Sequence, residues 1–577
     1  MEEKPMTPTI SDNIRTRIRT LPKEKLLLLG IIILAFFLRI YKLSLVEFKN
    51  DEAFWCQQAK KMIETREIPL RGQHAGATNI TVYLGPFLTY LTALSFLIFG
   101  ESVKSGIYMV VFLNTATVYL TYKTGKELYD TATGLIAALL LAVSPWMVIY
   151  SRKIWPQDLL PFFLSLMILT TYKIVTTTRV TTTIKNPKNL QEKMKKEWYT
   201  VILGVSIGLS IQLHLTALIL PPLVFLLFYI YKVPLKQYII LILSILLALS
   251  PLLIHDLFHG FQNTKAYFSI ALDPNARPKE ENYFTHLSNA LWFYYSIIGG
   301  RGLEDKIGNF YWKNSSFLKY FAIEPWIVLI FLLSNIALIV QTIKKKKPLA
   351  SLPKNDIMIT FWIGIPLILL LLTQGEIYIH YFIILSPAYT IATATTLTKL
   401  TKKMKQKTKN SYNKNSNIKS KTWKKATMKV FKKNPWTLSI LIICTITAIQ
   451  IATLSQFFAY VEDTGGQNEY GSTLESKQAA INYVKNDIPE NYTVDISGTG
   501  DAKQAYIFLL QKACINYYTE EEEQTGENYQ IWYYILEIKY FPDKRVHQII
   551  QTLEESPNTL DKKDFKSVIV YKTNIRI

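Results

Sequence analysis

Residues 26–55 read LLLLGIIILAFFLRIYKLSLVEFKNDEAFW. Residues 26–38 are uncharged and apolar, as expected of a helix that crosses the roughly 30 Å hydrocarbon core of a bilayer. The run ends at Arg39 and Lys42 rather than at a small-residue cleavage site, so it predicts an uncleaved membrane helix and not a signal peptide. Two adjacent carboxylates, Asp51 and Glu52, follow shortly after the end of this helix.

Further apolar runs of membrane-spanning length occupy residues 237–254, 325–343 and 436–459, and 49% of the 577 residues are hydrophobic. The chain is therefore expected to be a polytopic α-helical membrane protein. Its net charge of +22 is concentrated between these runs, with fourteen lysines and no acidic residue in 399–433. That distribution is typical of cytoplasmic loops beside anionic lipid, and it disfavours nucleic-acid binding.

The charges also predict a topology. A cytoplasmic N-terminus (residues 1–24) and a cytoplasmic Lys-rich loop (399–435) bound a transmembrane domain over residues 25–459. Large outer loops then occupy 42–105 and 255–324, and residues 85–100 lie in the outer leaflet without crossing. About eleven crossings satisfy this arrangement: the first helix, then 106–122, 131–150, 159–175, 199–213, 215–231, 237–254, 325–343, 357–373, 379–398 and 436–459.

The C-terminal segment 460–577 differs from the rest, with 19 acidic against 12 basic residues and no long apolar run. Its periodicities alternate between helix and strand. We expect a small extracytoplasmic α/β domain with helices over 473–486, 501–514 and 543–555 and strands over 491–497, 530–538 and 566–573.

Asp51 and Glu52 begin a helical pattern, so the simplest interpretation is an N-cap aspartate with a first-turn glutamate. A second group of charged residues, including Arg152 and Asp158, lies in the predicted outer turn SPWMVIYSRKIWPQD (144–158). Interfacial anchoring explains the tryptophans of this turn. It explains an aspartate near membrane depth less well, because such acids are costly unless paired or functional.

A third group, His380 and Tyr381, lies at the outer end of a predicted crossing, where histidine is usually a capping or interfacial residue. His255 and His259 share a helix face around Asp256, a spacing that suits a metal ion, but no third ligand is evident. The three cysteines form no metal-type pair. No metal site is assigned, and the cofactor stays unknown, with a divalent cation left open.

Together these groups predict an outer-face cavity with a carboxylate pair and nearby cations. Such a cavity suits transfer from an anionic, lipid-borne donor to a neutral hydroxyl. A carboxylate can take the proton of the attacking hydroxyl, while a cation offsets the charge that grows on a departing phosphate.

The order of motifs resembles the GT-C superfamily of membrane glycosyltransferases, and within it glycosyltransferase family 39, which includes the dolichyl-phosphate-mannose protein mannosyltransferases and the aminoarabinose transferases. The matching stretches run from Arg39 through Asp51, Glu52 and Ala59, then over 83–102, 139–166 and 380–394. The resemblance implies transfer of a sugar, with mannose one candidate, from a polyprenyl-phosphate donor at the outer face of the cell membrane. It also implies Asp51 as catalytic base or its close partner, Glu52 beside it, and Arg152 and Asp158 lining the donor or acceptor side.

One family element is missing. A Lys-Pro-Pro or His-Pro-Pro element often precedes the segment equivalent to 83–100 in the family, but this chain reads TVYLGP over 81–86, without a cation. The donor phosphate is then expected to meet another cation, namely Arg152, Lys104 or Arg301.

Two acceptor classes stay open, a protein and a glycolipid or cell-wall polymer. The Trp-Trp-Asp signature of oligosaccharyltransferase catalytic subunits is absent, which argues against transfer of a whole glycan to asparagine. A transporter or lipid flippase is the alternative from another class, but the acids gather at one face and no internal repeat is evident. A structural membrane scaffold is the third alternative, but it explains the outer carboxylates only as helix caps.

Overall fold

The computed structural model describes residues 22–75, 80–177, 187–273, 282–303, 321–373, 376–413, 435–466, 470–487, 492–515, 517, 531–538 and 543–574. Most of the predicted cytoplasmic N-terminus, much of the Lys-rich loop 399–435 and parts of the predicted outer loop 255–324 lie outside these residues.

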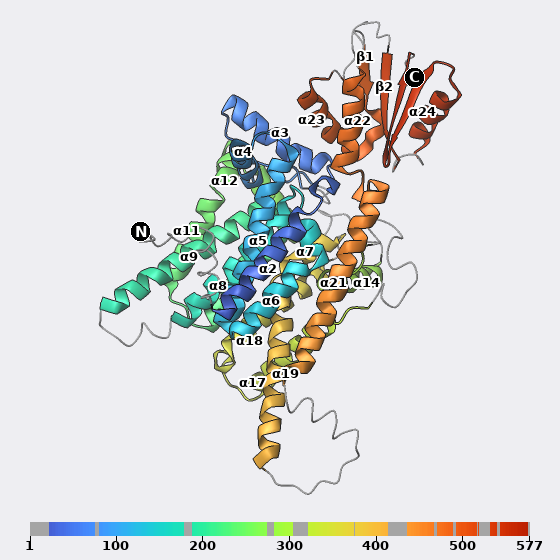
Figure 1. Ribbon diagram of the computed structural model, residues 1–577. Helices are drawn as coiled ribbons and strands as arrows, with labels where there is room; N and C mark the ends of the chain where they lie inside the picture. The colour runs from blue at the N-terminus through green and yellow to red at the C-terminus, as the bar shows by residue number, and fades with distance from the viewer. Residues whose placement is uncertain are drawn as a thin grey trace, which may run out of the picture.

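The described chain forms a long helical body and a small separate sheet domain at one end of it (Figure 1). Apolar side chains facing lipid or one another explain the helices of the body. Those that coincide with predicted crossings are α2 (Lys23–Ile40), α5 (Val103–Leu128), α6 (Thr131–Val143), α8 (Leu160–Thr177), α9 (Pro187–Leu213), α10 (Leu220–Ile230), α11 (Leu235–Ala248), α17 (Glu324–Lys344), α18 (Lys354–Leu372), α19 (Ala388–Asn413) and α21 (Thr437–Thr464).

Every predicted crossing thus contains a helix, but fewer helices are long and apolar enough to span a membrane by themselves. Five described helices meet that condition, and a sixth span results if α11 and α12 (Ser250–Phe258), bent by 65° at their junction, are counted as one. The chain is an integral membrane protein with five or six such candidate spans among its described residues, and the count of eleven stays a prediction.

Ion pairs gather several predicted cytoplasmic segments at the end of the body remote from the sheet domain. Lys126 at the end of α5 binds Glu24 at the start of α2. Three further pairs join neighbouring helices there: Lys173–Glu127 at 2.6 Å, Lys399–Asp356 at 2.6 Å and Lys402–Asp130 at 2.7 Å. These ion pairs hold several of the segments that the charge pattern assigns to the cytoplasm close together, and the side of the membrane on which they lie stays a prediction.

The segment 85–100 forms helix α4 (Phe87–Phe99), which does not run the length of the body. The hydroxyl of Tyr90 near its start donates to the carbonyl of Pro69 at 2.6 Å. Just beyond its end, Glu101 pairs with Lys60 of α3 (Asn50–Thr65) at 3.4 Å. Both ends of α4 are thus tied to the α3 region, at the end of the body that faces the sheet domain (Figure 1). That residues 85–100 do not cross the membrane stays a prediction.

The predicted outer loop 255–324 contains helices in its described parts. They are α12, α13 (Gln262–Leu272) and α14 (Tyr283–Gly299). Short connecting helices complete this face of the body: η1 (Leu43–Leu45), α7 (Pro145–Tyr150), η2 (Pro156–Leu159), η3 (Leu215–Ile219) and η5 (Ile379–Leu385), while η4 (Leu349–Ser351) precedes α18 at the opposite end.

The C-terminal residues form the expected α/β domain around a sheet that has four strands among the described residues. Helices α22 (Leu474–Asn486), α23 (Lys503–Ala513) and α24 (Lys544–Glu555) agree with the predicted ones, as do β1 (Tyr492–Asp495), β2 (Ile531–Glu537) and β4 (Val568–Thr573). The sheet order is β1-β2-β4-β3, with β1 parallel to β2 and the other pairs antiparallel. Edge strand β3 (Thr559–Phe565) was not expected.

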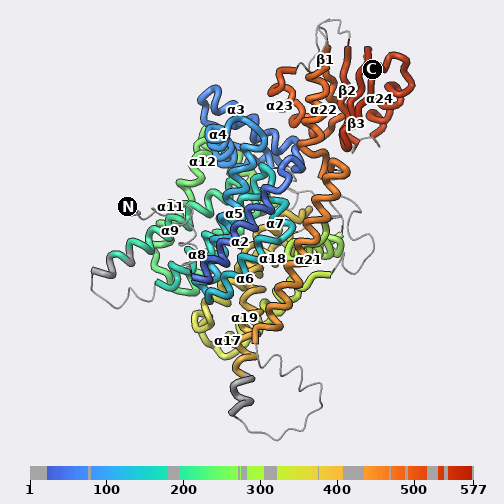
Figure 2. Tube along the Cα trace, in the orientation of Figure 1, coloured from blue at the N-terminus to red at the C-terminus, as the bar shows by residue number. Residues whose placement is uncertain are grey.

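The α/β domain docks on the segment that links α2 to α3, as the adjoining blue and orange segments of Figure 2 show. The amide of Leu474 donates to the carbonyl of Val46 at 2.9 Å, and the amide of Gln504 donates to Oδ1 of Asn50 at 2.8 Å. The rings of Phe48 and Phe508 meet edge to face. Short helix η7 (Ser497–Ala502) is thereby brought to the first turn of α3.

Candidate active site

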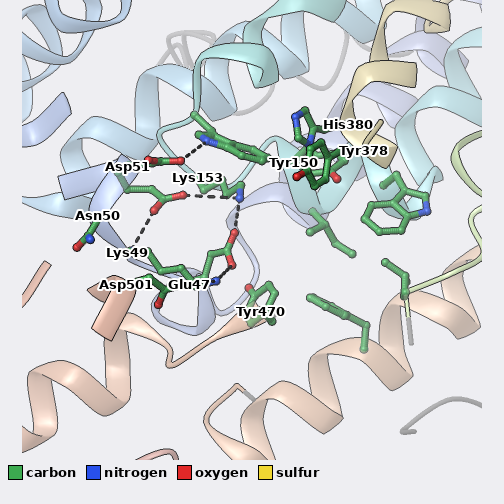
Figure 3. Close-up of a pocket in the computed structure, with 16 residues that line it drawn as sticks. Glu47, Lys49, Asn50, Asp51, Tyr150, Lys153, Tyr378, His380, Tyr470 and Asp501 are labelled. Carbon is green, nitrogen blue, oxygen red and sulfur yellow. Dashed lines mark hydrogen bonds and ion pairs between the residues drawn. The ribbon is translucent and has the colours of Figure 1, made fainter. Parts of the chain in front are cut away.

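A cavity of about 500 Å³ lies where the start of α3, the turn after α7, the segment before η5 and the α/β domain meet (Figure 3). Its walls combine acids, two lysines and several aromatic rings. The lining residues are Glu47, Lys49, Asn50, Asp51, Glu52, Trp146, Ile149, Tyr150, Lys153, Trp155, Leu303, Tyr378, His380, Phe457, Tyr470 and Asp501.

Asp51 presents its carboxylate to this cavity from the first turn of α3. Oδ1 accepts a hydrogen bond from the side-chain amide of Gln73 at 2.5 Å, and Oδ2 accepts one from the indole of Trp155 at 3.1 Å. The N-cap position belongs to Lys49, so the expectation that Asp51 caps the helix is wrong. Its carboxylate is instead oriented by two side chains that come from distant parts of the sequence.

Glu52 performs the capping, because its Oε2 accepts the backbone N–H of Lys49 at 3.0 Å. Its side chain is buried, and Oε1 lies 3.6 Å from Nζ of Lys153. Burial raises the pKa of Glu52 to about 7, although Lys153 acts in the opposite direction. Glu52 therefore combines a structural task at the helix start with a place in the wall of the cavity.

Lys153 lies at the centre of the cavity wall. Its ammonium stands 3.6 Å from the ring centroid of Trp155 and also binds the carboxylate of Glu47. Burial opposes its charge, but the carboxylates of Glu47 and Glu52 outweigh burial and hold the pKa of Lys153 above its ordinary value. The ammonium is thus a permanent cation.

The remaining charged groups of the wall come from the linker before α3 and from the α/β domain. Nζ of Lys49 lies 3.7 Å from Glu47 and 4.0 Å from Asp501 of η7. Asp501 stands 450 positions after Asp51 in the chain, so only the docking of the α/β domain brings the two carboxylates to one cavity.

His380 lines the cavity as part of an aromatic cluster. Its ring lies 4.8 Å from that of Trp155 and stacks on Tyr378 at 5.6 Å between centroids. Tyr381, also predicted for the site, does not line the cavity. Its ring packs behind the wall, against His380 at 4.8 Å and His214 at 5.2 Å.

The predicted phosphate contact Arg152 lies outside the cavity lining. Its guanidinium donates to the carbonyls of Leu38 at 3.2 Å, Tyr41 and Lys42 at 2.9 Å, which lie in the last turn of α2 and just beyond it. The ring of Phe458 covers its other face. Arg152 is buried and serves as a helix cap, so the cation that reaches the cavity is its neighbour Lys153.

The other two predicted phosphate contacts are also absent from the lining. Arg301 is buried, and its guanidinium donates to the carbonyl of Phe321 at 2.8 Å and to the hydroxyl of Thr453 at 3.0 Å. Its backbone carbonyl accepts the indole N–H of Trp146, so Arg301 supports the wall from behind. Lys104 lies in the first turn of α5, away from the described lining.

Asp158 is buried behind the wall and not in it, with 1% of its surface exposed. Its backbone carbonyl accepts the side-chain amide of Asn114 at 2.9 Å. Neither carboxylate oxygen has a hydrogen-bond partner among the described residues. The expectation that Asp158 lines the donor or acceptor side therefore lacks support in the cavity itself.

The histidine pair considered for a metal ion has another arrangement. The rings of His255 and His259 stack at 4.0 Å between centroids. The carboxylate of Asp256 accepts the backbone N–H groups of Asn263 and Thr264 at 2.8 and 2.7 Å, which caps the start of α13. Within the described ranges, no group of three His, Cys, Asp or Glu side chains could hold a metal ion.

Three comparisons with known proteins bear on this fold and site. Residues 84–255 match the family model described as dolichyl-phosphate-mannose-protein mannosyltransferase. Among solved structures, ArnT from Cupriavidus metallidurans in the apo state matches with a TM-score of 0.52 at 10% identity, covering 95% of this chain and 97% of that one. No curated protein matches.

Two further structures give lower scores. ArnT from Cupriavidus metallidurans bound to undecaprenyl phosphate has a TM-score of 0.49 at 11% identity, covering 95% of this chain and 98% of that one. The archaeal oligosaccharyltransferase AglB from Archaeoglobus fulgidus, in complex with an inhibitory peptide and a dolichol-phosphate, has a TM-score of 0.47 at 12% identity, covering 90% and 69%.

The segment 84–255 is similar to a family of membrane glycosyltransferases, and the apo ArnT structure shares the fold of this chain. The matched segment and the apo ArnT fold confirm the resemblance to the GT-C superfamily that the sequence motifs indicated. The matched family and the structural neighbours are glycosyltransferases, and this is the enzyme class that the comparisons support.

Proposed function

We propose that this protein transfers a glycosyl group from a polyprenyl-phosphate-linked donor to an acceptor hydroxyl, with inversion at the anomeric carbon and Asp51 as the base. The family description names dolichyl-phosphate-mannose, which favours a polyprenyl phosphate as the carrier and mannose as one candidate sugar. The positive-inside pattern supports a cavity on the outer face of the cell membrane.

The single observation that carries the proposal is the setting of the Asp51 carboxylate. It lines the cavity, and the hydrogen bonds from Gln73 and Trp155 fix its orientation. A base oriented in advance can accept the proton of a hydroxyl without first reorganising. Glu52 is less suited to this role, because it is buried and engaged with the start of α3 and with Lys153.

The aromatic wall suits the sugar. Trp146, Tyr150 and Trp155 from the 144–158 turn line the cavity together with Tyr378 and His380, and Figure 3 shows Tyr150, Tyr378 and His380 grouped on one side of it. Aromatic rings offer flat apolar surface to the C–H faces of a sugar, while the carboxylates on the other side accept hydrogen bonds from its hydroxyl groups. The cavity volume of about 500 Å³ has room for a sugar with part of its acceptor.

The proposal includes two acceptor classes. A protein hydroxyl is the first candidate, and a glycolipid or cell-wall polymer is the second. The transporter alternative has less support, because the charged residues that line the cavity gather at one end of the described helical body and do not follow a path through it.

A transfer assay tests the proposal. Purified full-length protein in detergent is incubated with a labelled polyprenyl-phosphate hexose and with protein, glycolipid and polymer acceptors. We expect transfer by the wild type and a loss of at least about 100-fold in Asp51→Asn, since the amide cannot accept the proton. Asp564→Asn, on exposed edge strand β3, is the control and should keep full activity. Equal transfer by both variants would refute the assignment of Asp51.

A further inference from the structure

Glu47 is held between the two lysines of the cavity. Its carboxylate is hydrogen-bonded to Nζ of Lys153, and it lies 3.7 Å from Nζ of Lys49. All three side chains line the cavity, and Figure 3 shows Glu47 pointing from the linker toward Lys153. Two ammonium groups that converge on one carboxylate make an anion-binding site, occupied here by a group of the protein itself.

The charges that line the cavity show what an entering anion would meet while Glu47 is paired with the two lysines. Four carboxylates line it, those of Glu47, Asp51, Glu52 and Asp501, against the two ammonium groups of Lys49 and Lys153. The arginines predicted to meet a phosphate are engaged elsewhere, Arg152 at the end of α2 and Arg301 behind the wall. A second anion entering with Glu47 in place would therefore meet a site whose cations are already neutralised.

We propose that Lys49 and Lys153 bind the phosphate of the lipid-linked donor, and that the carboxylate of Glu47 occupies this phosphate site until the donor displaces it. The inference rests on the proposed function, which it deepens by assigning the phosphate contact. Carboxylate and phosphate both offer anionic oxygens to an ammonium group, so the same two lysines can serve either in turn.

The surroundings favour movement of Glu47 and retention of Lys153. Glu47 belongs to an extended segment whose backbone forms an isolated antiparallel bridge with Thr473, so the side chain can turn away while the backbone stays. Lys153 is buried and is fixed over the ring of Trp155. Lys49 passes close to Gly471, where a Cβ would lie 2.5 Å from its Cε. The glycine therefore leaves room for this lysine.

Displacement of Glu47 by the donor phosphate fits the change of charge in the proposed reaction. The acceptor oxygen forms a bond to the anomeric carbon and gives its proton to Asp51, while the bond from that carbon to the phosphate oxygen breaks with its electron pair going to phosphate. The phosphodiester monoanion thus leaves as a phosphomonoester with one more negative charge. Lys49 and Lys153, once they are no longer paired with Glu47, stabilise this added charge.

Equilibrium binding of labelled polyprenyl phosphate, without any sugar, tests the phosphate site in purified full-length protein. Glu47→Gln should bind several-fold more tightly than the wild type, because the competing carboxylate is gone. Lys49→Gln and Lys153→Gln should bind at least about tenfold more weakly. Glu475→Gln, an exposed residue of α22 outside the cavity, should bind as the wild type does. Unchanged or weaker binding by Glu47→Gln would overturn the proposal, and a gain in affinity is a result that misfolding does not produce.

Two competitors identify the group that is recognised. Polyprenol, which lacks the phosphate, should compete weakly and equally in wild type and Glu47→Gln, and a gain for polyprenol as well would overturn the phosphate assignment. Inorganic phosphate should compete only at far higher concentration than polyprenyl phosphate, and equal potency would overturn the assignment to a lipid-linked phosphate. Binding is measured without transfer, so a failure of the proposed reaction with any acceptor is distinguishable from a failure of this site.

Discussion

The indole Nε1 of Trp155 donates a hydrogen bond to Oδ2 of Asp51 over 3.1 Å, although the two residues are 104 positions apart in the chain. The same indole ring supports the ammonium of Lys153 on its face. One tryptophan thus contacts both the proposed base and the proposed phosphate contact. It holds the carboxylate of Asp51 and the ammonium of Lys153 at a set distance from each other.

Replacing Trp155 by phenylalanine removes the hydrogen bond to Asp51 and keeps an aromatic surface for Lys153. A hydrogen bond to a charged group contributes about 1.5–3 kcal/mol, so we expect kcat to fall roughly 10- to 100-fold with a smaller change in donor KM. Trp326→Phe, an exposed tryptophan of α17, is the control. Steady-state transfer kinetics measure both constants, and a change in donor KM alone would contradict this role.

Arg152 is expected to matter for stability and not for donor binding. Arg152→Lys keeps the charge but loses most of the hydrogen bonds to the carbonyls at the end of α2, which should cost roughly 1–3 kcal/mol of unfolding free energy. The apparent melting temperature in detergent should fall, while the donor KM of the folded protein is unchanged. Arg66→Lys, an exposed residue after α3, should change neither. A raised donor KM at wild-type stability would instead support a phosphate contact.

The sequence predicts the parts of the fold whose cause is local. Apolar runs predict the helices of the body, and alternating patterns predict β1, β2 and β4 within a few residues. The sequence does not predict strand β3, because TLDKKDF carries four charged residues and no apolar alternation, as is common in edge strands exposed to water. Its pairing with β4 supplies the strand structure that its own side chains do not indicate.

The candidate site is only partly predictable for a similar reason. Asp51, Glu52 and His380 were expected in the cavity and do line it. Arg152 and Lys153 are adjacent cations in one turn, and only the position of the end of α2 decides which of them caps a helix and which reaches the cavity. Other lining residues, such as Glu47 and Asp501, depend on the docking of the α/β domain, which no local pattern in the sequence indicates.

The α/β domain contains a buried ion pair whose disruption should loosen it locally. Lys477 binds Glu537 of β2, and both side chains are at most 1% exposed. Lys477→Met leaves the carboxylate buried without its partner, at a cost of about 3–5 kcal/mol, whereas Lys477→Met with Glu537→Leu should recover most of the loss. Hydrogen exchange of strand β2, followed by mass spectrometry in the full chain, measures the effect. Equal exchange in the single and double variants would contradict the pairing.

Single cysteines placed on either side of α4 test whether this helix crosses the membrane. Glu64→Cys precedes α4, Glu101→Cys follows it and Lys123→Cys lies near the far end of α5. In a background in which exposed Cys444 and Cys514 are serine, we expect a membrane-impermeant thiol reagent to label positions 64 and 101 from one side of sealed vesicles and position 123 from the other. Labelling of 64 and 101 from opposite sides would show that α4 crosses.

The stability of the protein should depend on pH through Glu52. Burial raises the pKa of Glu52 from its ordinary value of 4.5 to about 7, so the folded protein binds this proton more tightly than the unfolded chain does. Its contribution to stability is therefore fully present below about pH 4.5 and is lost as the pH rises to about 7.

Glu52→Gln resembles the neutral acid at every pH, so its melting temperature minus that of the wild type should increase across this window and stay constant above it. Melting curves between about pH 4 and pH 8 measure this difference, with Glu64→Gln, exposed on the same helix, as the control that follows the wild type. A curve for Glu52→Gln that runs parallel to the wild type would mean that Glu52 has the same proton affinity in the folded and unfolded chains.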